Sequence, residues 1–287
     1  MSENKKEKFS YSKLSCYGNC PYNYYLTYIK HVERSQNIYG SAGGTAHELV
    51  QALEIGEITN EEAVEKWLGQ MDFYEFCGED NFPSDKAKKN YINDVKLYFK
   101  NFKPLDTKEK EILIEKEFEI EVEGVILRGF IDLTLINHFT KEIEVIDYKT
   151  SSKNGFTKDH LTEKCRQLIL YCIALQELYP DYKIIRVSFD MLKYGINEKG
   201  QVKERKDIPP DRENEYSRYF IKIPFTQENI DKFKEFVRDS LKEINTAKEN
   251  DNWNVNRNNF SFFCKYLCST SDYCESYQKY KNKYKKK

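Results

Sequence analysis

The most regular pattern of apolar and polar positions in the chain lies over residues 111–122. Apolar side chains alternate there with glutamates: Ile112, Ile114, Phe118, Ile120 and Val122 against Glu115, Glu117, Glu119 and Glu121. Successive side chains of a β-strand point to opposite faces, so the pattern predicts a strand with one buried and one solvated face. Glu123-Gly124 is expected to turn the chain into the next strand.

Two more strand-like runs follow between Gly124 and Lys149, joined by the polar residues 137–141. In the first run the alternation predicts one core face made by Val125, Leu127, Ile131, Leu133 and Leu135. Arg128 and Asp132 are expected on the opposite face. In the second run, Ile143, Val145, Asp147 and Lys149 are expected to share a face.

Each of these runs carries an aspartate where an apolar residue would be the default. Asp147 and Lys149 should project together, roughly 6–7 Å apart at ~3.3 Å per residue. If Asp132 converges on them, two carboxylates beside a lysine form a hard-oxygen site for Mg²⁺ or Mn²⁺. Such a lysine can hold a nucleophilic water or stabilise charge on a phosphate. The alternative is a set of solvated strand-end residues. One of Glu115 or Glu117 is a further candidate to support the metal site, although a solvated face is the default for both.

Helical periodicity covers most of the remaining chain. Helices are expected over residues 61–76, 85–103, 160–179 and 226–250, strands over 184–195 and 219–225, and a charged loop over 196–217. Gln167 and Tyr171 are four residues apart and should share one face of their helix; an ordinary polar pair is the alternative. Near the start, Ser12 is a candidate helix cap and Pro21 a candidate first-turn residue.

A glycine-rich turn and then a helix are expected over residues 40–56. Thr45 and Glu48 have the spacing of a capping box, which would place His47 in the first helical turn. The positive end of the helix dipole disfavours imidazolium, so His47 is expected to be neutral and able to bind a metal. A purely structural histidine is the alternative.

Composition narrows the class of protein. The 287 residues are 32% charged and 15% aromatic with a net charge of −1, which is not a disordered composition and gives no global basic field. The chain shows no apolar run long enough to cross a membrane and no apolar signal core, so a cytoplasmic location is expected. Residues 1–8 are expected to be a disordered lead, and 279–287, with six lysines, a basic tail.

Eight cysteines in such a chain are unlikely to form structural disulfides. Cys165 and Cys172 lie on the apolar stripe of their helix and are expected in the core. Cys264, Cys268 and Cys274 cluster near the end, which favours a soft metal or an iron–sulfur cluster. A fourth thiolate would come from the cysteines outside helices, which are Cys16, Cys20 and Cys77.

The order of these features resembles the RecB-like branch of the PD-(D/E)xK nucleases. The shared motifs are Cys20-Pro21, Gly44-Thr45-Ala46-His47, Gly129-Phe130-Ile131-Asp132, Asp147-Tyr148-Lys149, Gln167-x-x-x-Tyr171 and the terminal cysteine triplet. The resemblance is to the iron–sulfur members, namely the AddB nuclease domain and the CRISPR-associated RecB-like exonucleases. It runs from about Phe9 to Cys274.

The resemblance implies a role for each matching residue. His47, Asp132, Asp147 and the backbone carbonyl of Tyr148 would bind Mg²⁺ or Mn²⁺. Lys149 would be the catalytic lysine, with Gln167 and Tyr171 near the site and the DNA strand. Cys20, Cys264, Cys268 and Cys274 would hold an iron–sulfur cluster, of the 4Fe-4S type. The chain departs from the family's cysteine pattern in two ways. Three residues separate Cys264 from Cys268, where two are common, and Cys16 competes with Cys20 as the fourth ligand. A Cys₄ zinc site is the alternative to an iron–sulfur cluster.

The resemblance also implies a fold and a function. The fold is α/β and restriction-endonuclease-like, a mixed central sheet flanked by helices, with a cysteine-cluster cap that joins the termini. The boundaries are a single nuclease domain over 9–278, a helical insertion over 57–104, and cap segments over 9–30 and 251–278. The activity is a metal-dependent DNA exonuclease, acting on single-stranded ends in recombination, repair or foreign-DNA processing, with any helicase or other recombination partner in a separate chain. The alternatives are a catalytically silent nucleic-acid-binding or scaffold protein and a small redox protein.

Overall fold

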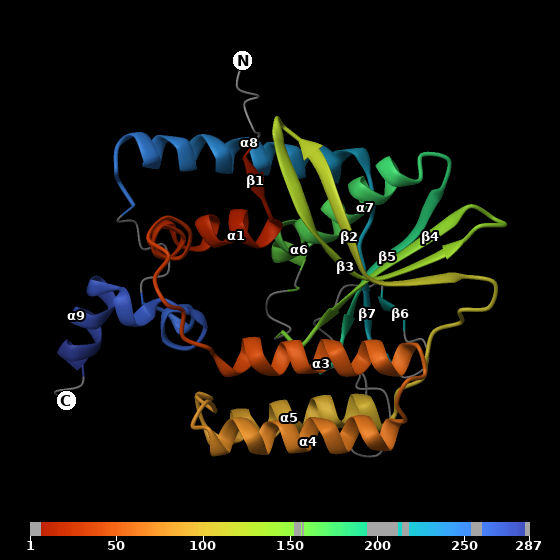
Figure 1. The fold of residues 1–287 in the computed structure, drawn as a ribbon, viewed down its shortest axis with the longest axis horizontal. Coiled ribbons are helices and arrows are strands. Elements are labelled where there is room, and N and C mark those ends of the chain that lie inside the picture. Colours follow the sequence, from red (N-terminus) through yellow and green to blue (C-terminus); the bar gives the residue numbers. More distant parts are fainter. Residues whose placement is uncertain are drawn as a thin grey trace.

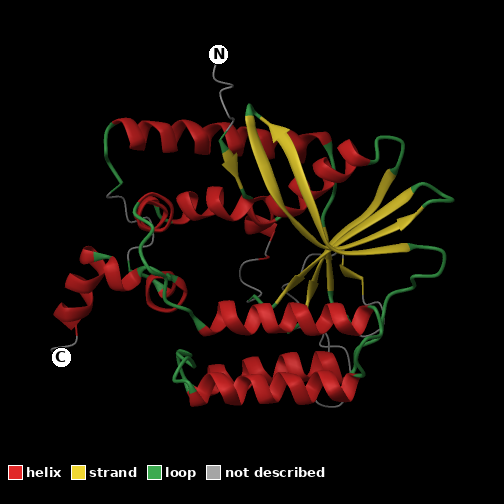
Figure 2. Cartoon of the chain, in the orientation of Figure 1, coloured by secondary structure: helices red, strands yellow, loops and turns green. Residues whose placement is uncertain are grey.

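A computed structural model describes residues 7–151, 156, 158–193, 212–213, 218–253 and 260–284. It confirms the predicted α/β class, with a mixed sheet between two helical layers (Figures 1 and 2). The described strands are β1 Lys8–Phe9, β2 Glu111–Val122, β3 Val125–Asn137, β4 Glu142–Lys149, β5 Lys183–Met191, β6 Arg212–Glu213 and β7 Phe220–Lys222. Most of the loops predicted over 151–159 and 196–217 lie outside the described residues, as do residues 1–6 and 285–287.

The helices follow the predicted order along the chain. They are α1 Tyr11–Asn19, α2 Pro21–Tyr24, α3 Ile38–Glu54, α4 Asn60–Phe76, α5 Asp85–Lys100, α6 Lys158–Lys164, α7 Arg166–Leu178, α8 Gln227–Glu249 and α9 Glu275–Tyr284. Short turns of other helix types are η1 Tyr25–Ile29, η3 Phe263–Leu267 and η4 Ser271–Tyr273. The predicted helix over 160–179 is thus two helices, α6 and α7, which meet at Cys165.

The sheet has the order β1-β3-β4-β5-β7-β6, and β2 pairs with β3 outside that path. Strands β2, β3 and β4 form an antiparallel meander, whereas β4 and β5 are parallel and are joined through α6 and α7. The turn between β2 and β3 is the predicted Glu123-Gly124, whose φ angles are 51° and 81°. Two positive φ values in a row are the geometry of a two-residue hairpin turn.

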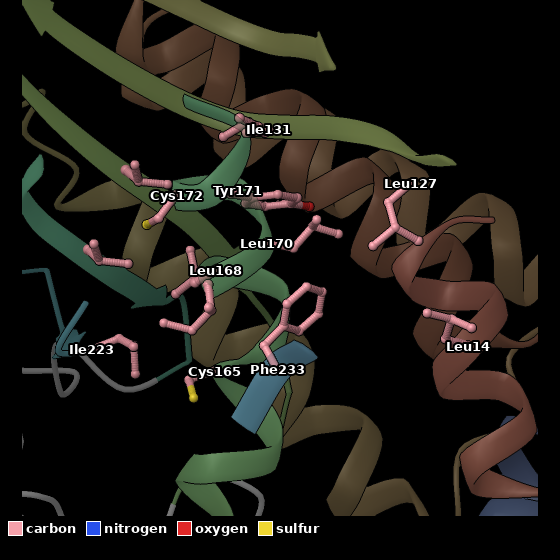
Figure 3. Packing of buried hydrophobic residues seen from close by; sticks show 14 of the residues in the cluster. Leu14, Leu127, Ile131, Cys165, Leu168, Leu170, Tyr171, Cys172, Ile223 and Phe233 are labelled. Carbon is pink, nitrogen blue, oxygen red and sulfur yellow. The ribbon is translucent and has the colours of Figure 1, made fainter. Parts of the chain in front are cut away.

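Two hydrophobic clusters cover the two faces of the sheet. The first joins β3, β4 and β5 to α1, α7 and α8, and it contains Cys165 and Cys172 as predicted (Figure 3). The second joins the sheet to α3, α4 and α5, with α4 and α5 lying beyond α3 (Figure 1). In β4 the alternation is as predicted: Ile143 and Val145 face the first cluster, and Ile146 and Tyr148 face the second.

In β3 the predicted single core face is wrong. Leu127 and Ile131 belong to the first cluster, but Leu133 and Leu135 belong to the second. The change of face falls where the β2–β3 ladder skips one pair: Ile114 pairs with Leu133 and Lys116 with Ile131. Between them Glu115 has a φ of 48°. A local irregularity of this kind reorients side chains, and here it lies opposite Asp132.

Three expectations about helix starts and the chain lead also need correction. Helix α1 is capped by Ser10, whose side chain accepts from the N–H of Lys13, and not by Ser12. Helix α3 begins at Ile38 with Asn37 as its cap, so the glycines at 40–44 are helical and the Thr45 capping box does not form. The Thr45 hydroxyl instead donates to the Ser41 carbonyl. Lys8, expected in a disordered lead, starts β1, which pairs in parallel with β3.

Segments from the two ends of the chain lie against each other. The backbone N–H of Ser35 donates to the carbonyl of Ser269 at 2.8 Å, and Thr270 Oγ1 donates to Asn23 Oδ1 at 2.7 Å. Both segments contain a π-helical turn, η1 and η3. Among the helices the structure describes, none combines the length and the apolar character needed to span a bilayer.

Candidate active site

Asp147 and Lys149 lie together near the end of β4. The Lys149 ammonium pairs with Asp147 Oδ2 and also donates to Gln167 Oε1 at 3.3 Å. The Asp147 side chain has no exposed area. Its Oδ1 atom accepts no hydrogen bond from any residue that the structure describes. A buried carboxylate with a free oxygen is costly unless a cation or donor reaches it.

Asp132 lies on β3 and completes a pair of carboxylates. Its Oδ2 accepts from the backbone N–H of Tyr148 at 3.0 Å, which ties β3 to the segment between Asp147 and Lys149. The same oxygen is 3.4 Å from His47 Nδ1. The structure therefore brings together four side chains, those of His47, Asp132, Asp147 and Lys149, which the sequence separates by up to 102 positions.

His47 reaches this site from the interior of α3, not from a helix start. It is the tenth residue of the helix (Ile38 to His47), on the side that faces the sheet, and its ring meets the Tyr148 ring edge-on at 5.9 Å. The helix dipole was therefore the wrong reason for expecting a neutral imidazole. Burial is what lowers the pKa of His47, although the Asp147 carboxylate opposes that effect. A neutral imidazole is the form that binds metal.

Burial and mutual repulsion raise the pKa of Asp132 well above its usual range. Burial is the largest cause, the Asp147 carboxylate adds to it, and Lys149 and the Tyr148 N–H oppose it. Two carboxylates that share a small, poorly solvated site cannot both ionise freely without a cation. The electrostatics of Asp132 and Asp147 are therefore those of a cation-binding site.

Gln167 and Tyr171 extend the site along α7. Gln167 accepts from Lys149 and donates its amide to Tyr171 Oη at 2.6 Å, so the predicted shared face is confirmed. The Tyr171 ring packs edge-on against Phe118 of β2 at 5.8 Å, and Figure 3 shows it beneath β3 near Ile131. Burial raises the pKa of Tyr171, which stays a neutral phenol. The chain of contacts from Asp147 to Tyr171 fixes the lysine.

Glu115 belongs to the same neighbourhood, and it is exposed, as expected for the solvated face. It lies opposite Asp132 in the skipped pair, its Oε1 accepts from Gln51 of α3 at 2.7 Å, and its charge contributes to the raised pKa of Asp132. Alternation alone places Glu115 with the solvated glutamates. Its positive φ is the feature that separates it from them.

Behind the site lies a buried ionic network that the sequence did not indicate. Arg218 donates to Glu54 Oε2 at 2.6 Å and to Asp190 Oδ2 at 2.7 Å, and Tyr98 donates to the same Asp190 oxygen at 2.7 Å. The two carboxylate side chains have no exposed area, and the arginine is 1% exposed. The Tyr148 side chain is buried beside this network: burial raises its pKa most, the charges of Glu54 and Asp190 add to the rise, and the charge of Arg218 opposes it. The network thus supports the residue whose N–H holds Asp132.

The donor set at Asp132 and Asp147 suits a hard divalent ion, since it combines two carboxylates with a neutral imidazole. Within the described ranges, no three His, Cys, Asp or Glu side chains already stand as a complete ligand set. The Lys149 ammonium, paired with Asp147, is the cation at that carboxylate in this arrangement. The buried free oxygen of Asp147 is the observation that fits an ion.

The four cysteines named for a cluster line one small pocket. Cys20, Cys264, Cys268 and Cys274 surround a cavity of about 10 Å³ between η1 and η3. Cys16 does not line this cavity; its sulfur instead accepts from Asn23 Nδ2 at 3.2 Å. Cys77 is exposed. The arrangement favours Cys20 over Cys16 as the fourth candidate ligand.

Two carboxylates and a lysine on the neighbouring strands β3 and β4 are groups of the kind that metal-dependent hydrolysis of phosphate esters uses. A family model described as the PD-(D/E)XK nuclease superfamily matches residues 8–275, and the chain belongs to this superfamily. The "Gene 69 protein" of Mycobacterium phage D29 is 26% identical over 182 residues, which cover 54% of this chain. The chain spans 66% of that protein, just under two thirds of its length. The superfamily implies nuclease chemistry with divalent metal ions on nucleic acid.

Proposed function

We propose that this protein is a metal-dependent DNA exonuclease that hydrolyses phosphodiester bonds at single-stranded ends. The observation that carries the proposal is the pairing of Lys149 with a fully buried Asp147 next to Asp132. Superfamily membership supplies the reaction class. Recombination, repair or foreign-DNA processing is the proposed setting, with any helicase as a separate chain.

His47, Asp132, Asp147 and the backbone carbonyl of Tyr148 are the proposed ligands of Mg²⁺ or Mn²⁺. A bound divalent ion would lower the pKa of a water and stabilise negative charge on the scissile phosphate. The protein holds its carboxylates ready for this role: the Tyr148 N–H fixes one oxygen of Asp132, and burial discourages water from solvating Asp147. The neutral imidazole of His47 offers a lone pair without adding positive charge.

Lys149 is the proposed catalytic group of the protein itself. Its ammonium has three donors; it forms an ion pair with Asp147 and donates one hydrogen bond to Gln167 Oε1 in this structure. A remaining donor can orient an attacking water or a phosphate oxygen. The positive charge of the ammonium stabilises the negative charge that develops on the phosphate oxygens in the transition state. Tyr171 holds Gln167, and Gln167 holds the ammonium, so the two polar residues on α7 act by positioning Lys149.

We also propose that Cys20, Cys264, Cys268 and Cys274 hold a cluster of the 4Fe-4S type, with zinc as the alternative. The observation that supports this proposal is that the four cysteines line one small pocket. A cluster there would cross-link residue 20 to residues 264–274 and reinforce the contacts between the two chain ends.

The test uses linear and circular single-stranded DNA of the same sequence, each with Mg²⁺ or Mn²⁺ and protein prepared without oxygen. An exonuclease degrades the linear strand, labelled at the 5′ or the 3′ end, and leaves the circle intact. Asp132→Ala and Lys149→Ala should abolish the activity. Cleavage of the circle would assign an endonuclease instead, and binding without any cleavage would assign a catalytically silent nucleic-acid-binding protein.

A further inference from the structure

A groove beside the candidate active site is not used by the hydrolytic residues. It has a volume of about 490 Å³ and lies between the first residues of α1, the β2–β3 hairpin and α7. Gln167 and Tyr171 form one end of its lining, so it is continuous with the chain of contacts that leads to Lys149. Its size is in the range of sites that take a small organic group.

Gly129 and its cross-strand partner Phe118 both line the groove. A Cβ atom built on Gly129 would lie 3.1 Å from Cζ of Phe118, which is tighter than most Cβ contacts. The absence of a side chain at Gly129 thus lets the Phe118 ring lie against β3. Phe118 and Tyr171 are buried and give the groove an aromatic, apolar wall.

The rim combines one exposed ring with one cation. Phe130 is 52% exposed, unusual for a phenylalanine, and it lines the groove together with Arg128. The two residues are two positions apart on β3, on the same face, and so about 6–7 Å apart along the strand. Glu117, the cross-strand partner of Phe130, is also on the rim and is an acceptor for amino groups.

We propose that this groove binds one unstacked nucleobase of a single DNA strand next to the scissile phosphate. The base would stack on the exposed Phe130 ring, Arg128 would contact the adjoining phosphate, and Glu117, the cross-strand partner of Phe130, would meet the polar edge of the base. Exposed aromatic rings beside cations are the usual means of holding single strands. A base that is still paired cannot enter, so the groove selects for unpaired ends. The inference rests on the proposed nuclease function and narrows its substrate.

The test measures binding without cleavage, using the full-length protein in chelator. The probes are short single-stranded oligonucleotides in which one base at a time is removed to leave an abasic sugar. For the wild type, one position should weaken binding far more than its neighbours. Phe130→Ala should weaken binding of the intact oligonucleotide by about 5- to 150-fold. It should have little effect on the oligonucleotide that already lacks the critical base, because the same contact cannot be lost twice.

Phe139→Ala is the matched control, since Phe139 is 92% exposed at the β3–β4 turn and does not line the groove. It should bind as the wild type does. Any of three results would refute the groove proposal. The first is an equal loss of affinity at every abasic position, and the second is an unchanged affinity for Phe130→Ala. The third is a loss for Phe139→Ala as large as that for Phe130→Ala. Failure of the groove proposal can be told apart from failure of the proposed function. If the protein cleaves DNA but no single base is critical for binding, only the groove proposal is refuted. If one base is critical but the protein never cleaves DNA, only the proposed nuclease activity is refuted.

Discussion

Replacing Arg218 by methionine should destabilise the protein strongly, because it removes the only cation of the network described above. The guanidinium contacts Glu54 and Asp190, whose side chains have no exposed area. Tyr98 donates a hydrogen bond to Asp190, and the backbone N–H of Leu105 donates one to Glu54. Without Arg218, two buried carboxylates keep these neutral donors but lose their counter-ion.

The expected loss is about 3–5 kcal/mol of unfolding free energy, which is the usual effect of removing one partner of a buried pair. Most of it comes from the uncompensated charge and not from the contacts themselves. In a chain of this size it corresponds to a melting temperature lowered by roughly 6–10 °C. Arg238→Met is the control, because that guanidinium is 57% exposed and pairs with Glu123 at the surface. Its expected effect is below about 1 kcal/mol.

Urea denaturation of both variants measures the two losses. A triple variant, Glu54→Gln with Asp190→Asn and Arg218→Met, separates charge from packing. It should recover most of the stability, since no buried charge is then left unpaired. A loss for Arg218→Met as small as that of Arg238→Met would refute the reasoning, and so would a triple variant no more stable than Arg218→Met.

Three further predictions concern the site, the cysteines and the groove. In chelator, the unfolding free energy should fall as the pH rises from about 4 through the raised pKa of Asp132, because the folded state favours the neutral carboxyl. Asp132→Asn should flatten the dependence of unfolding free energy on pH, and the same dependence in both proteins would contradict the pKa shift. Cys268→Ser should remove the visible absorbance of a bound cluster and cost about 4 kcal/mol, the scale of a cross-link over a long loop, whereas Cys77→Ser, at an exposed thiol, should change neither. Gly129→Ala should destabilise by about 1–3 kcal/mol through contact with Phe118, and adding Phe118→Leu should recover part of this loss; two independent, additive losses would contradict the contact.

Local periodicity predicted most elements of the fold. The alternation over 111–122 gave β2 with its observed bounds, and the turn at Glu123-Gly124 was also right. The face of β3 was wrong, because alternation assumes regular backbone and the positive φ of Glu115 has no signature in the residue type. Glu115 itself is exposed, as expected, and its charge still contributes to the raised pKa of Asp132.

Tertiary packing explains the error at α3. Glycines at 40, 43 and 44 are poor helix formers, so a turn was the natural expectation. Ala42 and Ala46 are fully buried in the second cluster, and packing of this helix against the sheet outweighs the glycine propensity. A Cβ on Gly43 would make an ordinary contact of 3.5 Å with Thr150 Oγ1, which shows how closely α3 approaches the end of β4.

The site residues differ in how visible they were. Asp132, Asp147 and Lys149 stood out as charged residues in apolar strands, and the geometry brings them together. Arg218 could not be found in this way, because it follows a charged segment and its partners, Glu54 and Asp190, lie in elements far away in the sequence. A single arginine carries no periodic signal; only the fold shows that it is buried.

The central claim is that Asp132, Asp147 and Lys149 form a metal-dependent hydrolytic site. The most direct measurement is the rate at which an end-labelled single-stranded oligonucleotide is cleaved by the wild type and by Lys149→Met, with Mg²⁺, with Mn²⁺ and with chelator. The account predicts cleavage by the wild type only when a metal is present, and a rate at least about 100-fold lower for Lys149→Met. Cleavage that persists in chelator, or a Lys149→Met variant as fast as the wild type, would contradict it.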